Sequence, residues 1–244
     1  MVLVRIESVE ISSSGYMRCK SEFYTVEDVT TRANTYHFFP GINALYGECD
    51  SGNWGISYLL SMYQHERYSR KHIINSPLIA KVNGETVPLE QIWDISCYMV
   101  SGMDPLFASR KTVRQLVQKA INKNHLSESV EDIQRIFHIE NVRFDRRIQY
   151  TGHEVFRMMA AIGYCNGKEI FCFPWMSESR FDAFTGHLAD TLRILDSLNK
   201  IVILPVSEAT DIDAFWRTSS GSEIFQKYWN DSRFQDFYTH TEAK

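Results

Sequence analysis

The segment EIFCFPWMSESRFDAFTGHLADTLRILDSLNKIVILPV, from Glu169 to Val206, decides the fold class of this chain. It contains two apolar runs, EIFCF (169–173) and KIVILPV (200–206), of the kind that forms strands buried on both faces. Between them, FDAFTGHLADTLRILDSLN has the apolar spacing of a helix. A strand, a helix and a second strand in this order predict a parallel sheet, because a parallel connection needs a long crossover.

Further strands are predicted upstream of this segment. INALY (42–46) and SCYMV (96–100) are short apolar runs that we expect in the same parallel sheet. Near the N-terminus, apolar and polar residues alternate, which is typical of strands with one face in water. A later strand, at 78–82, runs into Asn83-Gly84, a strong hairpin signal. The sequence therefore predicts an antiparallel β section before the parallel sheet is complete.

The middle of the chain has helical periodicity. TVRQLVQKAINKNHL and VEDIQRIFHI carry apolar residues at helical spacing, and they predict a small helical subdomain at about 105–149. EVFRMMAAIGYC (154–165) predicts another helix, which Asn166-Gly167 would stop. No linker or repeat divides the chain, so 1–244 is predicted to be one domain of the α/β class.

Composition excludes several function classes. The net charge is −4 and the lysines and arginines look scattered along the chain, which argues against a nucleic-acid partner. Five cysteines without a C-x-x-C pair, and histidines without ligand spacing, predict reduced thiols and no metal site. No apolar run approaches the ~18 residues of a membrane-spanning helix, and no secretion signal is evident, so we expect a soluble, cytoplasmic protein.

The stretch YGECDSGNWG (46–55) has the frame of a phosphate-binding loop. Gly47 and Gly52 are separated by four residues and lie between an apolar strand and a helical run, as in G-x-x-x-x-G-K-[ST]. Asn53 and Trp54 stand where that motif has Lys and Ser/Thr. The stretch is therefore a nucleotide site, the remnant of one, or an ordinary turn.

The order of these pieces resembles the nucleotide-binding domain of ATP-binding-cassette (ABC) transporters, over about residues 2 to 215. VNGETVPLEQIWDISCYMV is similar to the family's hairpin and following strand, and MDPLFASRKTVRQLV to its entry into the helical subdomain. YTGHEVFRMMAAIGY resembles the signature motif, L-S-G-G-Q, and its helix. Thr151, Gly152 and Arg157 match that motif, whereas His153 and Glu154 replace Gly and Gln. The resemblance implies a P-loop NTPase-like core.

The same resemblance implies which positions of this chain correspond to the family's catalytic and metal-binding residues. At the end of EIFCF, Pro174 stands at the slot of the Mg²⁺-binding Asp and Trp175 at the slot of the catalytic Glu. Ser207, after KIVILPV, stands at the slot of the switch His, and Ser101 at that of a metal-sensing Gln. With Asn53 and Trp54, the charged and metal-binding groups are missing from all of these slots.

ATP hydrolysis in this fold needs a cation on the β- and γ-phosphates, Mg²⁺ ligands and a group that positions water. Each lost charge-assisted contact is worth roughly 1.5–3 kcal/mol. We therefore predict that no residue is catalytic, that no cofactor is required, and that binding of ATP and Mg²⁺ is weak or absent. Two alternatives stay open: compensating roles for Asp50, Glu178 or Asp182, and a loop backbone that still binds a weak anion.

Two tryptophans are placed to fill the vacated site. We expect the strands that precede Trp54 and Trp175 to be neighbours, so that both indoles flank one hollow and one or both of them pack over it or into it. The alternative for Trp54 is an ordinary position in the core between helix and sheet.

Taken together, the resemblance implies a catalytically inactive ABC-type subunit, the structural or regulatory half of a transporter in peptide export or immunity. Its expected partners are a membrane permease, an active ABC ATPase or a second copy of the chain, and it would lie at the inner face of the membrane. An ABC ATPase with non-standard residues, or a soluble adaptor with the same fold, are the alternatives.

Overall fold

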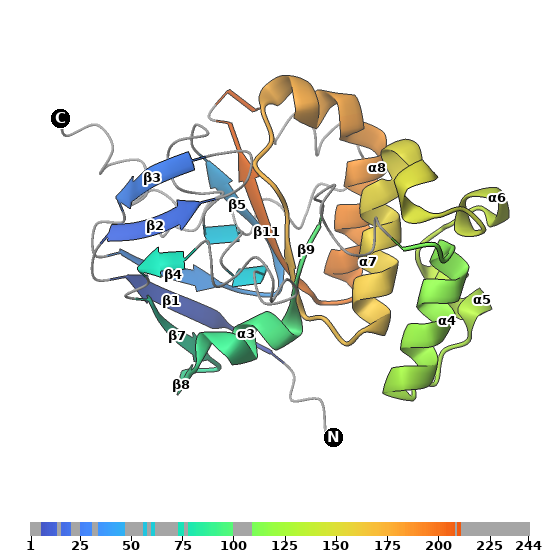
Figure 1. Cartoon of the computed structure of the whole chain (residues 1–244), viewed down its shortest axis with the longest axis horizontal. Coiled ribbons are helices and arrows are strands. Elements are labelled where there is room, and N and C mark those ends of the chain that lie inside the picture. Colours follow the sequence, from blue (N-terminus) through green and yellow to red (C-terminus); the bar gives the residue numbers. More distant parts are fainter. Residues whose placement is uncertain are drawn as a thin grey trace.

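The computed structural model describes residues 6–13, 16–20, 25–30, 34–46, 56–57, 60–61, 73–75, 78–99, 109–207 and 209–210. Two antiparallel sheets lie at one end of the molecule and a group of short helices at the other, with a parallel sheet between them (Figure 1). No helix in the described part of the chain is long and apolar enough to cross a membrane.

The central sheet is parallel, as predicted. Its strand order is β5-β11-β10-β9, and every neighbouring pair is parallel. The strands are β5 (Gly41–Tyr46), β9 (Ser96–Tyr98), β10 (Ile170–Cys172) and β11 (Ile201–Val206). One expectation is wrong: β5 and β10, which precede Trp54 and Trp175, are not neighbours, because β11 pairs with both and lies between them.

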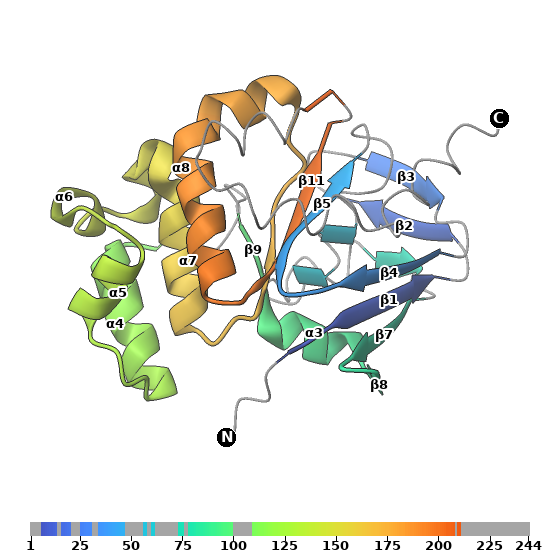
Figure 2. The same ribbon diagram turned by 180° about the vertical axis from the view of Figure 1, so that it is seen from behind.

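Both faces of the parallel sheet are buried, which explains its continuous apolar runs. Successive side chains of a strand point to opposite faces. Phe171 and Val202 therefore pack in one core with α7 (Val155–Cys165) and α8 (Glu178–Ser197), whereas Ile170 packs in a second core on the other face. Figure 2 shows α8 beside β11 and β5.

The N-terminal β section is antiparallel, as predicted, and it forms two sheets. The first has the order β4-β1-β7-β8, with β1 (Val9–Ser13), β4 (Asn34–Phe38), β7 (Leu78–Val82) and β8 (Glu85–Val87). The second has the order β3-β2-β6, with β2 (Tyr16–Lys20), β3 (Thr25–Thr30) and β6 (Ile73–Asn75). The predicted hairpin joins β7 to β8, and Asn83 and Gly84 have the positive φ values of 51° and 82° that such a turn requires.

The helices of the middle segment begin at side-chain caps. They are α4 (Val113–Asn124), α5 (Val130–Ile136) and α6 (Asn141–Phe144), followed by the 3₁₀ turns η2 (Ile148–Tyr150) and η3 (Gly152–Glu154). Thr112 and Ser129 form capping boxes that satisfy backbone N–H groups at the starts of α4 and α5. These helices lie at the end of the molecule away from the antiparallel sheets in both views (Figures 1 and 2).

One helix has no counterpart among the predicted elements. Helix α3 (Leu89–Ile95) lies between the hairpin and β9, and it starts directly after Pro88. It buries only Ile92 and Trp93, so its apolar spacing is too short to stand out as a period. The aromatic helical segment expected after Ala209 lies outside the described residues, apart from Ala209 and Thr210 themselves.

Candidate functional site

The predicted site residues follow the strands of the parallel sheet at their carboxyl ends. Pro174 and Trp175 come after β10, and Ser207 comes directly after β11. The carboxyl edge is where sheets of this type carry their ligand sites. The remaining predicted residues of this edge lie outside the described residues: Gly47, Gly52, Asn53, Trp54 and Ser101.

Backbone pairing brings the ends of β10 and β11 together. Ser207 donates its backbone N–H to the carbonyl of Met176 at 3.0 Å, and Met176 forms a parallel bridge with Val206. Met176 in turn donates to the carbonyl of Pro205 at 3.1 Å. Trp175 and Ser207 are therefore held in adjacent segments of one edge of the sheet.

The side chains at this edge are uncharged. Pro174 is buried, Ser207 is only 6% exposed, and Trp175 is half-buried. A proline carries no donor, an indole only donates, and a hydroxyl stays neutral. In the described part of the chain, no three His, Cys, Asp or Glu side chains are grouped to hold a metal ion. The described edge can form hydrogen bonds and apolar contacts, and it offers no ionised group to a phosphate or a cation.

A serine that sequence analysis overlooked supports this edge. Ser57 is fully buried in a helical segment three residues after Trp54, and its hydroxyl donates to the carbonyl of Phe173, the residue before Pro174. Ser61, one turn further on, donates to the Ser57 carbonyl at 3.0 Å. These bonds attach the helix after the predicted phosphate loop to the end of β10. Serines spaced four apart on the apolar side of a helix were the available signal.

The residues of the signature-like motif lie at the start of α7. Thr151 is buried and its hydroxyl donates to a backbone carbonyl of the preceding turn at 2.7 Å. Gly152 has φ of +63°, a left-handed conformation that favours glycine. His153 is exposed, and Glu154 is half-buried with the Arg143 guanidinium 3.9 Å away. Thr151 and Gly152, which match the motif, thus have roles in the local backbone that the structure accounts for.

A row of rings connects the signature-like motif to the end of β10. The ring centroid of His153 lies 5.4 Å from that of Phe184 and 6.3 Å from that of His187, to which it is nearly parallel. The ring centroid of Phe156 lies 5.2 Å from that of Phe184 and 5.4 Å from that of Phe173. Phe173 is the residue between the end of β10 and Pro174. The two predicted motifs are therefore joined by packed aromatic side chains.

Arg157, which matches the motif, is a structural residue. Its side chain is only 7% exposed and pairs with Asp190 of α8 at 2.8 Å, while a second nitrogen donates to the carbonyl of His138 at 3.0 Å. It thereby fastens α7 to α8 and to the segment that follows α5.

The two acidic residues considered as substitutes lie at the start of α8. Ser177 caps this helix by accepting from the backbone N–H of Arg180 at 3.3 Å, and Glu178 and Asp182 are exposed in its first turns. Carboxylates are favoured near the positive end of a helix dipole, which accounts for both positions.

The described cysteine thiols are unsuited to nucleophilic chemistry. Cys97, Cys165 and Cys172 are free and buried. Burial raises the pKa of Cys165 to about 12 and raises that of Cys172 well above its ordinary value. Cys165 and Cys172 therefore remain neutral thiols through the pH range in which exposed cysteines ionise, near pH 8.5.

We expect these thiols to resist alkylation. Native protein treated with iodoacetamide at pH 8 should retain unmodified Cys165 and Cys172, because the reactive thiolate is disfavoured and the sulfur is enclosed. The measurement is peptide mass spectrometry, with the protein unfolded in urea as a fully labelled control. Labelling of either residue in the native state at the rate seen in urea would contradict the buried placement.

No protein-family model matches this chain, and no characterised protein matches it in sequence. Solved structures do. The chain superposes on a protein from Pyrococcus furiosus described as an ABC transporter ATP-binding protein, with a TM-score of 0.52 and 14% identity, over 84% of this chain and 94% of that one. This chain has the fold of an ABC-transporter ATP-binding domain. A bacterial Atm1-family ABC exporter with ATP bound also matches, with a TM-score of 0.52 and 9% identity.

The second match differs in how much of each chain it covers. It covers 99% of this chain but only 43% of the exporter chain. At these identities the likeness concerns the fold, and the chemistry of the site depends on the side chains described above.

Proposed function

We propose that this chain is an ABC-type subunit that does not hydrolyse ATP and serves as a structural or regulatory part of a transporter. The observation that carries the proposal is the uncharged carboxyl edge, where Pro174, Trp175 and Ser207 lie side by side on adjacent strand ends. In an active ABC ATPase this edge supplies the metal-binding, water-positioning and phosphate-sensing groups.

The physical argument concerns charge. A triphosphate and its Mg²⁺ need cations and carboxylates placed before the reaction begins, because positioning and electrostatics supply nearly all of the catalysis. Buried proline and serine cannot replace them, and Asn53 supplies no cation where a phosphate loop has Lys. Losing three charge-assisted contacts would weaken ATP binding by about three powers of ten, even if the losses are only partly additive.

The proposed partners follow from the ABC-type fold. An inactive subunit contributes to a transporter by pairing with an active ATPase subunit, or with a second copy, and by transmitting movement to a membrane permease. The segment from Ser101 to Leu116 is the proposed contact with the permease, which would place the chain at the inner face of the membrane. A setting in peptide export or immunity is consistent with such a subunit.

Calorimetry and steady-state assays test the proposal. With Mg-ATP at millimolar concentration, we expect no heat of binding or only weak binding, and phosphate release equal to the buffer blank. An active ABC ATP-binding domain measured in parallel shows that the assay detects binding and turnover.

The proposal would be contradicted if other acidic residues took over the missing roles in ATP binding or hydrolysis. Micromolar affinity, or turnover that Asp50→Asn, Glu178→Gln or Asp182→Asn abolishes, would show an ATPase with non-standard ligands. Weak binding that is insensitive to Mg²⁺ would instead indicate only an anion-binding loop and would leave the proposal intact.

A further inference from the structure

One segment of this acidic chain carries lysines and arginines without any acidic residue. Between residues 105 and 127 there are five lysines and arginines and no aspartate or glutamate. The whole chain has a net charge of −4, so subtracting this +5 leaves −9 for the remainder. Five of the 26 lysines and arginines therefore lie in this segment, which contains α4 and the residues just before it.

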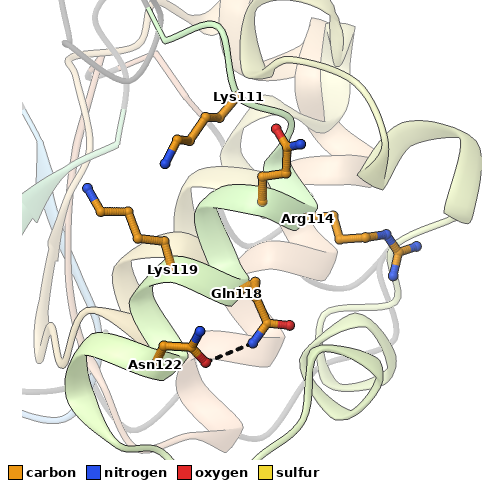
Figure 3. Close-up of a pocket in the computed structure, with 6 residues that line it drawn as sticks. Lys111, Arg114, Gln118, Lys119 and Asn122 are labelled. Carbon is orange, nitrogen blue, oxygen red and sulfur yellow. Dashed lines mark hydrogen bonds between the residues drawn. The ribbon is translucent and has the colours of Figure 1, made fainter.

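The structure separates α4 into two faces. One face is packed in the core, through Val113, Val117, Ala120 and Ile121. The opposite face is exposed and wholly polar, and it comprises Gln115, Gln118, Lys119, Asn122 and Lys123. Together with Lys111, which precedes the helix, we call these residues the basic face. A shallow hollow lies along it, lined by Lys111, Arg114, Lys119 and the amide side chains (Figure 3).

In the described part of the chain, no carboxylate forms an ion pair with the exposed lysines of the basic face. Arg114 points away from the other two cations in Figure 3, and it is bound by Asp145 at 2.7 Å and faces Glu131 at 3.8 Å. Lys111 and Lys119 extend on the other side, and neither forms an ion pair with any residue that the structure describes. Among the described residues, none neutralises these two ammonium groups, so they can attract a negatively charged partner.

We propose that the basic face binds the surface of an anionic lipid membrane. Lipid headgroups present many phosphates in a layer and are recognised by clustered basic residues, each worth roughly 1 kcal/mol near the surface. The exposed positions of α4 include no aromatic or aliphatic side chain. A protein interface usually relies on such buried anchors, whereas attraction to headgroups needs only charge.

The charge distribution would also orient the molecule. The helix α4 lies at the end of the molecule away from the antiparallel sheets (Figure 1), and the rest of the chain is acidic. An anionic surface would attract this end and repel the remainder. The inference goes beyond the proposed function, because lipid binding through α4 requires no nucleotide. The basic face shares Lys111 and Gln115 with the segment proposed for the permease contact, whereas Gln118, Lys119, Asn122 and Lys123 lie outside that segment.

Vesicle sedimentation tests the inference with a charge-matched pair of variants. Lys111→Gln/Lys119→Gln removes two cations from the basic face. Arg135→Gln/Arg180→Gln removes two exposed cations from α5 and α8, and so gives the same net charge. The full chain is mixed with vesicles of phosphatidylcholine alone, or with 30% phosphatidylglycerol, at about 0.1 M salt. Thermal melts check that both variants fold.

We expect the parent and the Arg135/Arg180 variant to bind the anionic vesicles alike, and the Lys111/Lys119 variant to bind at least about tenfold more weakly. Lys111→Arg/Lys119→Arg should bind as the parent does. Binding should fall steeply at about 0.5 M salt, where screening shortens the range of exposed charges.

Three results would overturn the inference. Equal losses in the two charge-matched variants would show a net-charge effect, and equal binding to neutral vesicles would show that charge is not recognised. Lys111- and Lys119-dependent binding to polyglutamate, without binding to anionic vesicles, would identify an acidic protein segment as the partner. None of these results bears on ATP hydrolysis, so failure here is distinct from failure of the proposed function.

Discussion

Replacing Phe156 by alanine is expected to lower the free energy of unfolding by about 3–5 kcal/mol. Phe156 is 1% exposed, and its ring lies between Phe173 at 5.4 Å and Phe184 at 5.2 Å. Truncation removes apolar area from the core and leaves a cavity where α7, α8 and β10 meet, and the backbone can close such a cavity only in part. Equilibrium unfolding in urea gives the change directly.

Two controls make this measurement specific. Phe156→Leu keeps most of the volume and should cost well under half as much. Tyr150 precedes the same motif but is 59% exposed, so Tyr150→Ala should change stability by about 0.5 kcal/mol or less. If Phe156→Ala proves as mild as Tyr150→Ala, the aromatic row does not join the signature-like motif to the sheet edge.

Removing Asp190 is expected to destabilise the chain more than removing Arg157, its ionic partner. Asp190→Ala leaves the guanidinium, whose side chain is 7% exposed, without its carboxylate, at a cost of about 3 kcal/mol. Arg157→Met instead removes the buried charge and fills much of its volume. The remaining Asp190 is 44% exposed and also contacts Arg193 at 3.3 Å, so this change should cost about 1 kcal/mol.

The double variant Asp190→Ala/Arg157→Met completes the cycle. Its stability should be close to that of Arg157→Met alone, because no buried charge is left to compensate. Chemical denaturation of all four proteins at one pH provides the comparison. Additive losses in the double variant, or a larger loss from Arg157→Met than from Asp190→Ala, would show that desolvation of Arg157 does not dominate.

Much of the sheet could be predicted from the sequence because its signals are local. The strands at 42–46, 170–172 and 201–206 are apolar runs, and any such run must be buried on both faces. The turn at Asn83-Gly84 depends on backbone conformations that few residues adopt, so two letters predict it. The short helix α3 and the second antiparallel sheet lack such local signals in the sequence.

The candidate site likewise has features that the sequence predicts and features that only the tertiary structure shows. The order of chemical groups along the chain is a property of the sequence, and Pro174, Trp175 and Ser207 could be read from it directly. Trp175 and Ser207 lie together because β10 and β11 are neighbouring strands. The hydrophobic pattern of a sequence does not encode strand order, so it did not predict that β11 lies between β5 and β10. The bond from Ser57 to the end of β10 joins residues more than a hundred positions apart, so the spacing of the serines on their helix does not show which strand they reach.

The charged residues around α4 show most clearly what the sequence determines and what the tertiary structure determines. The sequence by itself determined the fold class, through hydrophobic periodicity, and the run of cations between residues 105 and 127. Only the tertiary structure decided which of those charges are available, because α5 and α6 bring Glu131 and Asp145 to Arg114 and bring no carboxylate to Lys111 or Lys119. Electrostatic interactions act through space over a few ångströms, so a charge is neutralised by the residues that folding places beside it, whatever their distance along the chain.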